Sequence, residues 1–260
     1  MIPRPLHPRI WGLAAAAAVA LGFVAPALGC GAMTGQGRIV EATERGELRL
    51  EDGRALRLAG LDAPAPDAWL DRIAERWAAR DVRIALLAPA PDRWGRWLAD
   101  VQGGDGESLA DDLLAAGLVR VKPEFETRAC EAARLALERP ARERRLGLWA
   151  APGAVLSAAD GAALAAADGR FVVVEGRVRR IGQGRSRVYL DFGGRGGFTV
   201  IALRKAEAAF QRRGLAFSSF AGQSVRVRGV LDGRFGPRIE LADPLMIERT
   251  EGVGGSGSGG

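Results

Sequence analysis

The sequence is almost without histidine. Its single histidine among 260 residues is His7, which lies in an N-terminal segment that we expect to be removed. The mature chain would then contain none, which excludes a Ser-His-Asp triad, a Cys-His pair, a histidine general base and any His-ligated metal site. Catalysis would have to depend on carboxylates, arginines, backbone groups or a hard, oxygen-preferring metal ion.

Cysteine is nearly as scarce. Cys30 and Cys130 are the two cysteines, too few for a zinc ribbon or an iron–sulfur cluster. Ala27-Leu28-Gly29-Cys30 is similar to a bacterial lipobox, although Ala27 stands where that motif usually has Leu, so Cys30 is a candidate for lipidation. If Cys30 is lipidated or removed, Cys130 has no partner in the chain and is expected to be a small core residue.

Lysine is also rare, and arginine supplies nearly all of the positive charge, which exceeds the negative charge by 6. A basic balance favours anionic partners such as nucleic acid or an anionic membrane surface. The Ala-rich and Arg-rich runs fit a GC-rich coding sequence equally well, so composition alone does not decide between these interpretations.

The N-terminus has the pattern of an export signal. Arg4, His7 and Arg9 precede residues 10–28, which carry no charge and end in small residues. We therefore expect residues 1–30 to be a signal peptide or lipoprotein signal. The alternative is a retained membrane anchor, since the run almost reaches the length that spans a bilayer. The predicted location is the periplasm or cell envelope, with or without a lipid anchor in the membrane.

Residues 36–150 predict a first domain of mixed strands and helices. Alternation over residues 47–50 and the Asp52-Gly53 turn predict a hairpin within residues 38–58. Further strands are predicted at 82–87 and 97–101, and helices at 67–80, at 108–116 with Gly117 as cap, and at 125–145 with an interruption at Pro140.

The remaining chain predicts a second, smaller domain. Residues 151–169 are rich in Ala, Gly, Ser and Asp and are expected to be a linker with one turn of helix. Residues 170–250 show three strands, a helix and two strands, which is the order of an OB-fold barrel. Residues 251–260 predict a flexible tail or an added sequence. The expected fold class is α+β, mostly β, with two barrels in series.

Three segments carry a family resemblance. They are residues 57–64 (RLAGLDAP), residues 92–99 (DRWGRWLA), and residues 117–121 (GLVRV) with the helix that ends in Gly147-Leu148-Trp149. In order and spacing they resemble the staphylococcal-nuclease-like, or thermonuclease, family over roughly residues 38–150. The resemblance implies a five-stranded OB barrel with three helices and calcium-dependent hydrolysis of DNA and RNA phosphodiesters.

Three residues match the family's functional positions. Arg57 and Arg96 match the two phosphate-contacting arginines, and Asp62 matches one calcium carboxylate. In this chemistry two carboxylates and a backbone carbonyl hold the cation, which acts with the arginines to balance the charge that develops on the phosphate. A glutamate positions or deprotonates the attacking water. The alternative is structural: Asp62 orders a turn or pairs with Arg57, and Arg96 is a solvated strand residue.

Other family positions are lost. The second calcium aspartate falls on Gly46, the glutamate base on Ala65, and the two pocket tyrosines near Pro123 and Phe125. A positioned general base contributes about 10² to 10⁴ in rate, so these losses predict weak or absent hydrolysis and weak calcium binding. Substitution by a neighbouring carboxylate is the alternative, and the candidates are Glu44, Glu47 and Asp67.

The second domain is strongly basic. Residues 170–250 contain 16 Arg and Lys against 7 Asp and Glu. A basic groove with aromatic platforms is typical of single-strand binding, whereas buried aromatics under a solvated arginine face would be purely structural. The candidate nucleic-acid-binding residues are Arg177, Arg179, Arg180, Arg226 and Arg228, with Tyr189, Phe192, Phe198 and Phe235 among them.

Three functions therefore stay open. The first is an exported nucleic-acid- or phosphate-binding protein built on a thermonuclease-like domain with a degraded active site. The second is an active calcium-dependent nuclease with a rearranged site. The third is a non-enzymatic envelope protein whose basic face meets anionic lipid or polymer. The sequence implies no obligate protein partner.

Overall fold

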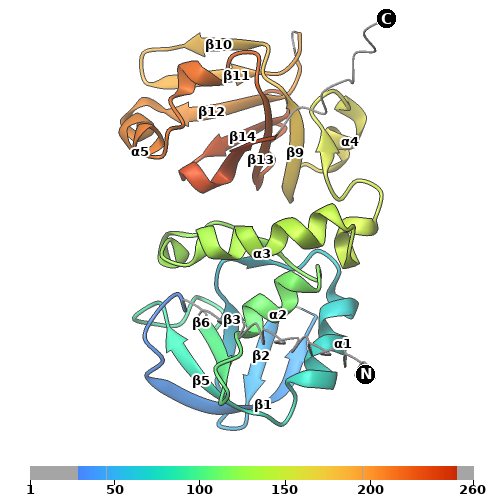
Figure 1. Cartoon of the computed structure of the whole chain (residues 1–260), viewed down its shortest axis with the longest axis vertical. Helices are drawn as coiled ribbons and strands as arrows, with labels where there is room; N and C mark the ends of the chain where they lie inside the picture. The colour runs from blue at the N-terminus through green and yellow to red at the C-terminus, as the bar shows by residue number, and fades with distance from the viewer. Residues whose placement is uncertain (1–28, 45, 195, 251–260) are drawn as a thin grey trace, which may run out of the picture.

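The chain forms two units, one at each end of the structure, with helix α3 (Glu131–Glu143) lying between them (Figure 1). The computed structural model describes residues 29–44, 46–194 and 196–250. The first hydrophobic core lies between Ile39 and Val121, and the second between Ala158 and Ile247. The predicted signal at 1–28 and tail at 251–260 lie outside the described residues.

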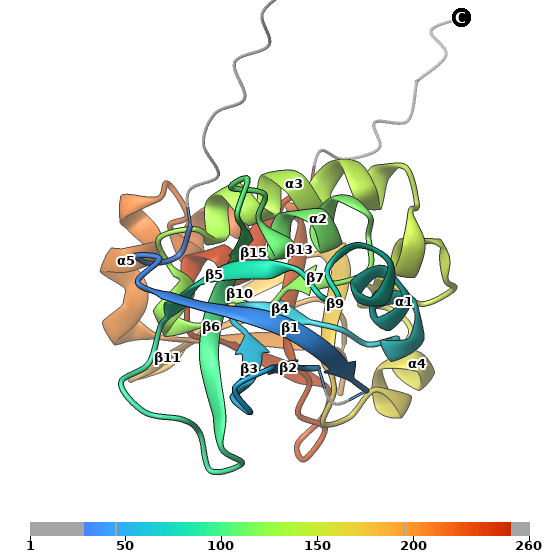
Figure 2. The same cartoon turned by 90° about the horizontal axis from the view of Figure 1, so that it is seen from below.

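The first unit is built on a closed barrel with the strand order β1-β2-β3-β6-β5 (Figure 2). Its predicted hairpin is present, and Gly53 makes the turn with a φ of 85°, a conformation that glycine adopts without strain. The five-stranded barrel with helices, within a mostly β chain of the α+β class, is therefore confirmed. The barrel strands are β1 (Gly35–Thr43), β2 (Glu47–Leu50), β3 (Ala55–Leu58), β5 (Asp81–Leu86) and β6 (Arg96–Gly103).

Helices and one small sheet complete this unit. In α1 (Pro66–Arg76) and its C-cap, Trp69, Ile73 and Trp77 recur every fourth residue, so all three reach the core. The Ser108 hydroxyl caps α2 (Leu109–Ala115) by accepting from the Asp111 amide. Strands β4 (Leu61–Asp62) and β7 (Arg120–Val121) pair beside the barrel. The elements α1 and α2 agree with the sequence patterns.

The third helix differs from its prediction. Residues 125–127 form a separate 3-10 turn, because Glu124 and Thr127 close a capping box around it. Helix α3 begins only at Glu131 and continues through Pro140. Proline lacks one donor, and its position near the end of the helix limits the loss of backbone bonds. Within the part of the chain that the structure describes, the 3-10 helices are η1 (Phe125–Thr127), η2 (Gly147–Ala150), η3 (Arg204–Ala206), η4 (Phe217–Phe220) and η5 (Pro244–Met246).

The second unit contains two four-stranded sheets, where the sequence predicted one small barrel. The predicted strand 171–180 divides because the Val178 amide donates to the oxygen of Gln223, just before β13 of one sheet, and the Arg179 amide donates to the oxygen of Asp191 in β11 of the other. One sheet has the order β10-β11-β12-β14 and the other β15-β13-β9-β8. The strands are β8 (Leu156–Ser157), β9 (Phe171–Arg177), β10 (Arg180–Gln183), β11 (Arg187–Asp191), β12 (Thr199–Leu203), β13 (Ser224–Val230), β14 (Arg238–Leu241) and β15 (Ile247–Arg249).

Two short helices pack on these sheets. They are α4 (Gly161–Ala166) and α5 (Glu207–Arg212), and the core takes up Leu164 from the first and Phe210 from the second. The segment expected to be a linker therefore contains β8 and α4 and contributes to the second core. Its small residues fit there because Ala158 and Ala167 are buried.

Candidate phosphate-binding site and domain interface

Arg57, the first candidate phosphate arginine, lies on β3 and is held by a carboxylate. Its Nη1 donates to Glu124 Oε1 at 2.8 Å, and Glu124 Oε2 accepts from the Gly60 amide at 3.1 Å. Both side chains are partly exposed, at 29% and 16%. The first arginine is therefore charge-compensated within the chain, by a residue that the sequence pattern did not identify.

Arg96, the second candidate, begins β6 and is also compensated. Its Nε and Nη2 donate to Asp92 Oδ2 at 3.0 and 2.8 Å, and Glu47 Oε1 lies 3.7 Å from Nη1. Burial raises the pKa of Asp92, but hydrogen bonds from the Arg96 side chain and from the amides of Arg96 and Trp94 outweigh it and lower the pKa to about 2. Asp92 is thus a carboxylate at neutral pH and neutralises Arg96.

Trp94 is an exposed aromatic side chain beside this pair. It is 62% exposed, and the guanidinium carbons of Arg93 and Arg96 lie 3.9 and 4.8 Å from its ring. A cation placed over an indole face is attracted by the ring quadrupole. Trp94 belongs to the segment 92–99 but is not among the candidate residues that the motif identifies. The tight turn at Gly95, with a φ of 77°, is the signal that it projects outward.

Asp62, the candidate calcium ligand, is paired with an arginine. Arg120 Nε donates to Asp62 Oδ2 at 2.8 Å, and Arg120 Nη2 donates to the backbone oxygen of Phe171 in the second unit. Arg120 is only 8% exposed. The expected Arg57–Asp62 pair is not among the ion pairs of the described residues, because each residue has another partner.

A cleft of about 560 Å³ opens beside Asp62. Ala65, where the resembling family has its glutamate base, lines this cleft together with Pro64, Arg120 and Phe171. At this position the wall of the cleft carries an alanine methyl group, which cannot take up a proton. Gly46, where the second calcium aspartate would stand, has no side chain and adopts a φ of 77°.

The three carboxylates named as substitutes do not build a metal site. Glu47 lies against Arg96, and Glu44 and Asp67 are exposed. Across residues 29–44, 46–194 and 196–250, no group of three or more His, Cys, Asp or Glu side chains is arranged to hold a metal ion.

The comparison with protein families agrees with the barrel fold of the first unit. Residues 55–151 match the model for the family described as staphylococcal nuclease homologue. The first unit is a staphylococcal-nuclease-like domain. The match contains Arg57, Asp62 and Arg96 and begins at β3, so the first two barrel strands precede it. No curated protein matches the chain.

Two of the five arginines proposed for nucleic-acid binding lie inside the contact with the nuclease-like domain. Arg228 is 2% exposed, and its Nη2 lies 2.9 Å from Glu138 Oε1 of α3. Arg226 pairs with Glu175 and Glu248. The alternation on β13 does place both arginines on one face, but α3 covers that face. The expectation that Arg226 and Arg228 belong to an open basic surface is therefore wrong.

Four further contacts belong to this network. Glu138 Oε2 accepts from the Val121 amide at 2.7 Å, and Arg228 Nη1 donates to the Val121 oxygen at 3.0 Å. Arg142 lies 2.9 Å from Glu138 and 3.5 Å from Glu248. Burial raises the pKa of Glu248, but its hydrogen bond with Arg226 and the charge of Arg142 lower it overall. The two domains are therefore joined by satisfied, buried charges.

The other three proposed arginines are exposed. Arg177, Arg179 and Arg180 lie at the end of β9 and the start of β10, and Arg180 pairs with Asp191 at 2.8 Å. Of the aromatic side chains proposed with them, Phe192 and Phe198 belong to the core, whereas Tyr189 is half-buried and Phe235 is 84% exposed. Of these four aromatic side chains, only Phe192 and Phe198 are the buried core residues that the structural alternative expected.

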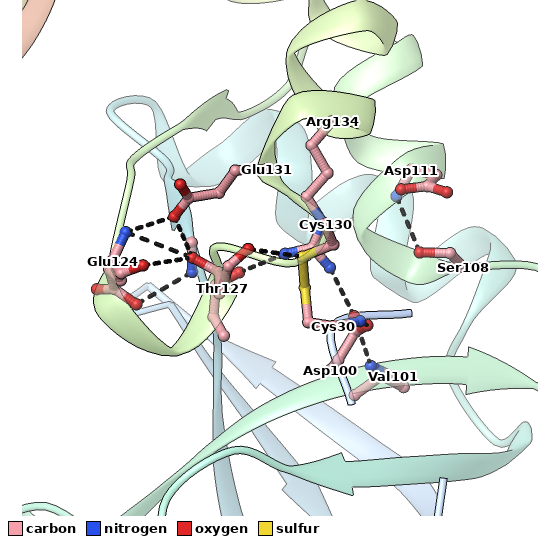
Figure 3. The surroundings of a disulfide bond; sticks show 12 residues. Cys30, Asp100, Val101, Ser108, Asp111, Glu124, Thr127, Cys130, Glu131 and Arg134 are labelled. Atoms are coloured by element: carbon pink, nitrogen blue, oxygen red, sulfur yellow. Dashed lines mark hydrogen bonds and ion pairs between the residues drawn. A yellow bond between two sulfur atoms is a disulfide. The ribbon is translucent and has the colours of Figure 1, made fainter. Parts of the chain in front are cut away.

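The two cysteines form a disulfide (Figure 3). Cys30 precedes β1 and Cys130 precedes α3, with their Cα atoms 5.0 Å apart. The Cys30 amide also donates to Asp100, a buried carboxylate 2.7 Å from Arg134. A disulfide uses the sulfur atom that lipidation of Cys30 would need, so this structure is incompatible with the predicted lipidation and with a free Cys130.

The surroundings of the disulfide hold a second buried carboxylate, Glu131 (Figure 3). Its Oε1 accepts from the Thr127 hydroxyl and the Glu124 amide. Burial raises the pKa of Glu131 more than these bonds lower it. Glu124 is thereby held in the position from which it contacts Arg57.

Among the described residues, no helix is long and apolar enough to span a bilayer.

Proposed function

We propose that this protein binds nucleic acid or phosphate through a nuclease-like domain whose calcium-dependent hydrolysis is weak or absent. One observation carries the proposal: Arg57 and Arg96 remain at the family's phosphate positions, but carboxylates of the chain itself neutralise both. A catalytic phosphate clamp needs cationic groups aimed at the charge that develops in the transition state. Here both arginines are already neutralised by carboxylates, and among the described residues Asp62 has no second carboxylate beside it to help hold a calcium ion, so that arrangement is not supplied.

Weak phosphate binding still fits this geometry. The side chains of Arg57 and Arg96 are 29% and 15% exposed, so a phosphate group can reach both arginines and compete there with Glu124 and Asp92. Arginine also presents a planar fork that matches phosphate oxygens. Binding is thus expected to be weak, dependent on salt and insensitive to calcium.

The test is cleavage of labelled single-stranded DNA and RNA in calcium, with a parallel reaction in chelator. We expect no cleavage that depends on calcium, and equal background from the Asp62→Ala variant. Calcium-dependent cleavage lost in Asp62→Ala would instead establish the active nuclease with a rearranged site. A binding isotherm over a salt series separates nucleic-acid binding from the envelope-protein alternative, because phosphate contacts give a steep dependence on salt.

We also propose that the chain is exported and works in an oxidising compartment. The Cys30–Cys130 disulfide supports this, since such bonds persist outside the reducing cytosol. An envelope location through a lipid on Cys30 is set aside, because the disulfide occupies its sulfur. N-terminal sequencing of the secreted protein tests the proposal: a mature N-terminus before Cys30 is expected, and cleavage after Cys30 would contradict it.

A further inference from the structure

The second domain carries a groove on the outer face of the sheet β10-β11-β12-β14. Tyr189 lies at its centre, opposite Gly182 on β10 and Ile201 on β12. Because glycine has no side chain, the Tyr189 ring lies against bare backbone, and a Cβ on Gly184 would be 3.4 Å from its Cε2. One face of the sheet therefore presents an aromatic ring at the floor of an open groove.

A second aromatic side chain stands at the edge of this groove. Phe235 lies in the β13–β14 connection, is 84% exposed, and has the guanidinium carbon of Arg238 5.0 Å from its ring. The groove has a volume of about 340 Å³. Tyr189 and Phe235 both line it, together with Arg180, Asp191, Thr199 and Arg238. Phe235 therefore lines the same groove as Tyr189 and Ile201, so the apolar side chains of the groove lie beside its arginines.

Arginines surround the groove in excess over carboxylates. Asp191 pairs with Arg180, and Asp232 pairs with both Arg234 and Arg238. Arg187 lies two residues before Tyr189 on β11, and Arg185 lies in the β10–β11 turn. Neither lines the groove itself, but both are exposed near one end of it and make no ion pair with any described residue. The charge therefore favours an anionic occupant.

From these features we infer that this groove binds single-stranded nucleic acid, with bases on Tyr189 and Phe235 and phosphates along Arg180, Arg185 and Arg187. Stacking on aromatic side chains needs unpaired bases, and every base offers a face for it. The inference rests on the proposed function in taking nucleic acid as the ligand. It adds a binding site that is separate from Arg57 and Arg96 and lies on the sheet β10-β11-β12-β14, whereas Arg228 lies on β13 of the other sheet.

The test is fluorescence anisotropy of a labelled single-stranded DNA oligonucleotide with the full chain. Loss of one stacking contact weakens binding by about 5- to 100-fold, so Tyr189→Ala/Phe235→Ala should weaken it by at least about 10-fold. Val230→Ala removes an exposed apolar side chain of the same domain and should leave binding unchanged. Arg187→Gln should weaken binding more than Arg212→Gln, an equal charge change on α5.

Other outcomes overturn the inference in distinguishable ways. If the wild type binds and the double variant binds equally, while Arg57→Gln/Arg96→Gln loses binding, the groove is not the site but the proposed function stands. If the wild type does not bind, both fail. Equal affinity for duplex DNA or heparin also overturns the inference.

If the double variant does not fold, two other measurements decide the question. They are binding by Phe235→Ala alone and photocrosslinking of bromouracil DNA to the peptide that contains Tyr189. Absence of a crosslink to that peptide contradicts the groove as the binding site.

Discussion

Arg228 of β13 and Glu138 of α3 form an ion pair between the two domains, and their side chains are only 2% and 0% exposed. Each has further partners, since Arg228 donates to the Val121 oxygen and Glu138 accepts from the Val121 amide. A charge left alone at such a depth is strongly unfavourable. The two domains therefore depend on one another for stability.

The first prediction concerns this pair. Arg228→Leu should lower the free energy of unfolding by up to about 3 to 5 kcal/mol, because the buried Glu138 loses one of its two arginine partners and keeps only Arg142. Urea denaturation measures the change. Arg180→Leu breaks an ion pair whose arginine is 78% exposed and should cost about 0 to 1 kcal/mol. Equal effects of the two substitutions would contradict the interface described here.

The second prediction concerns the disulfide. Cys30 and Cys130 are 100 residues apart in sequence, and in the chain-entropy model a loop of this size stabilises a fold by about 4 to 5 kcal/mol. Cys30→Ser/Cys130→Ser should lose most of this in urea denaturation. Reducing agent should destabilise the wild type alone, and a wild type indifferent to reductant would show that the bond is not formed.

The third prediction concerns the carboxylate on Arg57. Glu124→Gln removes the negative charge and keeps only one of the two acceptor oxygens that serve Arg57 and the Gly60 amide, so Arg57 becomes available to phosphate and binding of an oligonucleotide should tighten several-fold. Glu126→Gln makes the same change in net charge two residues away, at an exposed position. If both variants bind alike, the effect is one of overall charge and Arg57 is not a phosphate contact.

The fourth prediction concerns acid. The folded-state pKa of Asp92 is lowered from 3.8 to about 2, so the stability that it contributes is present above pH 4 and is lost as the pH falls from about 4 to 2. Asp92→Asn should therefore be less stable than the wild type at pH 6, and the difference should shrink by pH 2. Unfolding curves at both values measure it, and a difference that is constant with pH would be contrary to the pairing with Arg96.

Local patterns predicted much of the first domain. Trp69, Ile73 and Trp77 recur at helical spacing and form α1, and Asp52-Gly53 makes its turn. The alternation of Val and Arg on β13 was interpreted as an open basic face, because a period of two gives the faces of a strand and not what covers them. The partner of Arg228 is 90 residues away, and such a distance leaves no local signal.

The candidate site was also predicted only in part, because contacts between distant segments leave no local signal in the sequence. Motif positions identified Arg57, Asp62 and Arg96. Asp92, which pairs with Arg96, belongs to the same motif, but Glu124 and Arg120, the partners of Arg57 and Asp62, come from other segments that the fold brings together. The disulfide was missed because the lipobox-like segment offered Cys30 another chemistry.

The most direct test of the central claim is a single-stranded DNA cleavage assay on the mature protein, with calcium and with chelator. We expect equal, near-background cleavage in both, and no change in Asp62→Ala, because Arg120 holds Asp62 and no second carboxylate joins it among the described residues. Robust cleavage that requires calcium and disappears in Asp62→Ala would contradict the account.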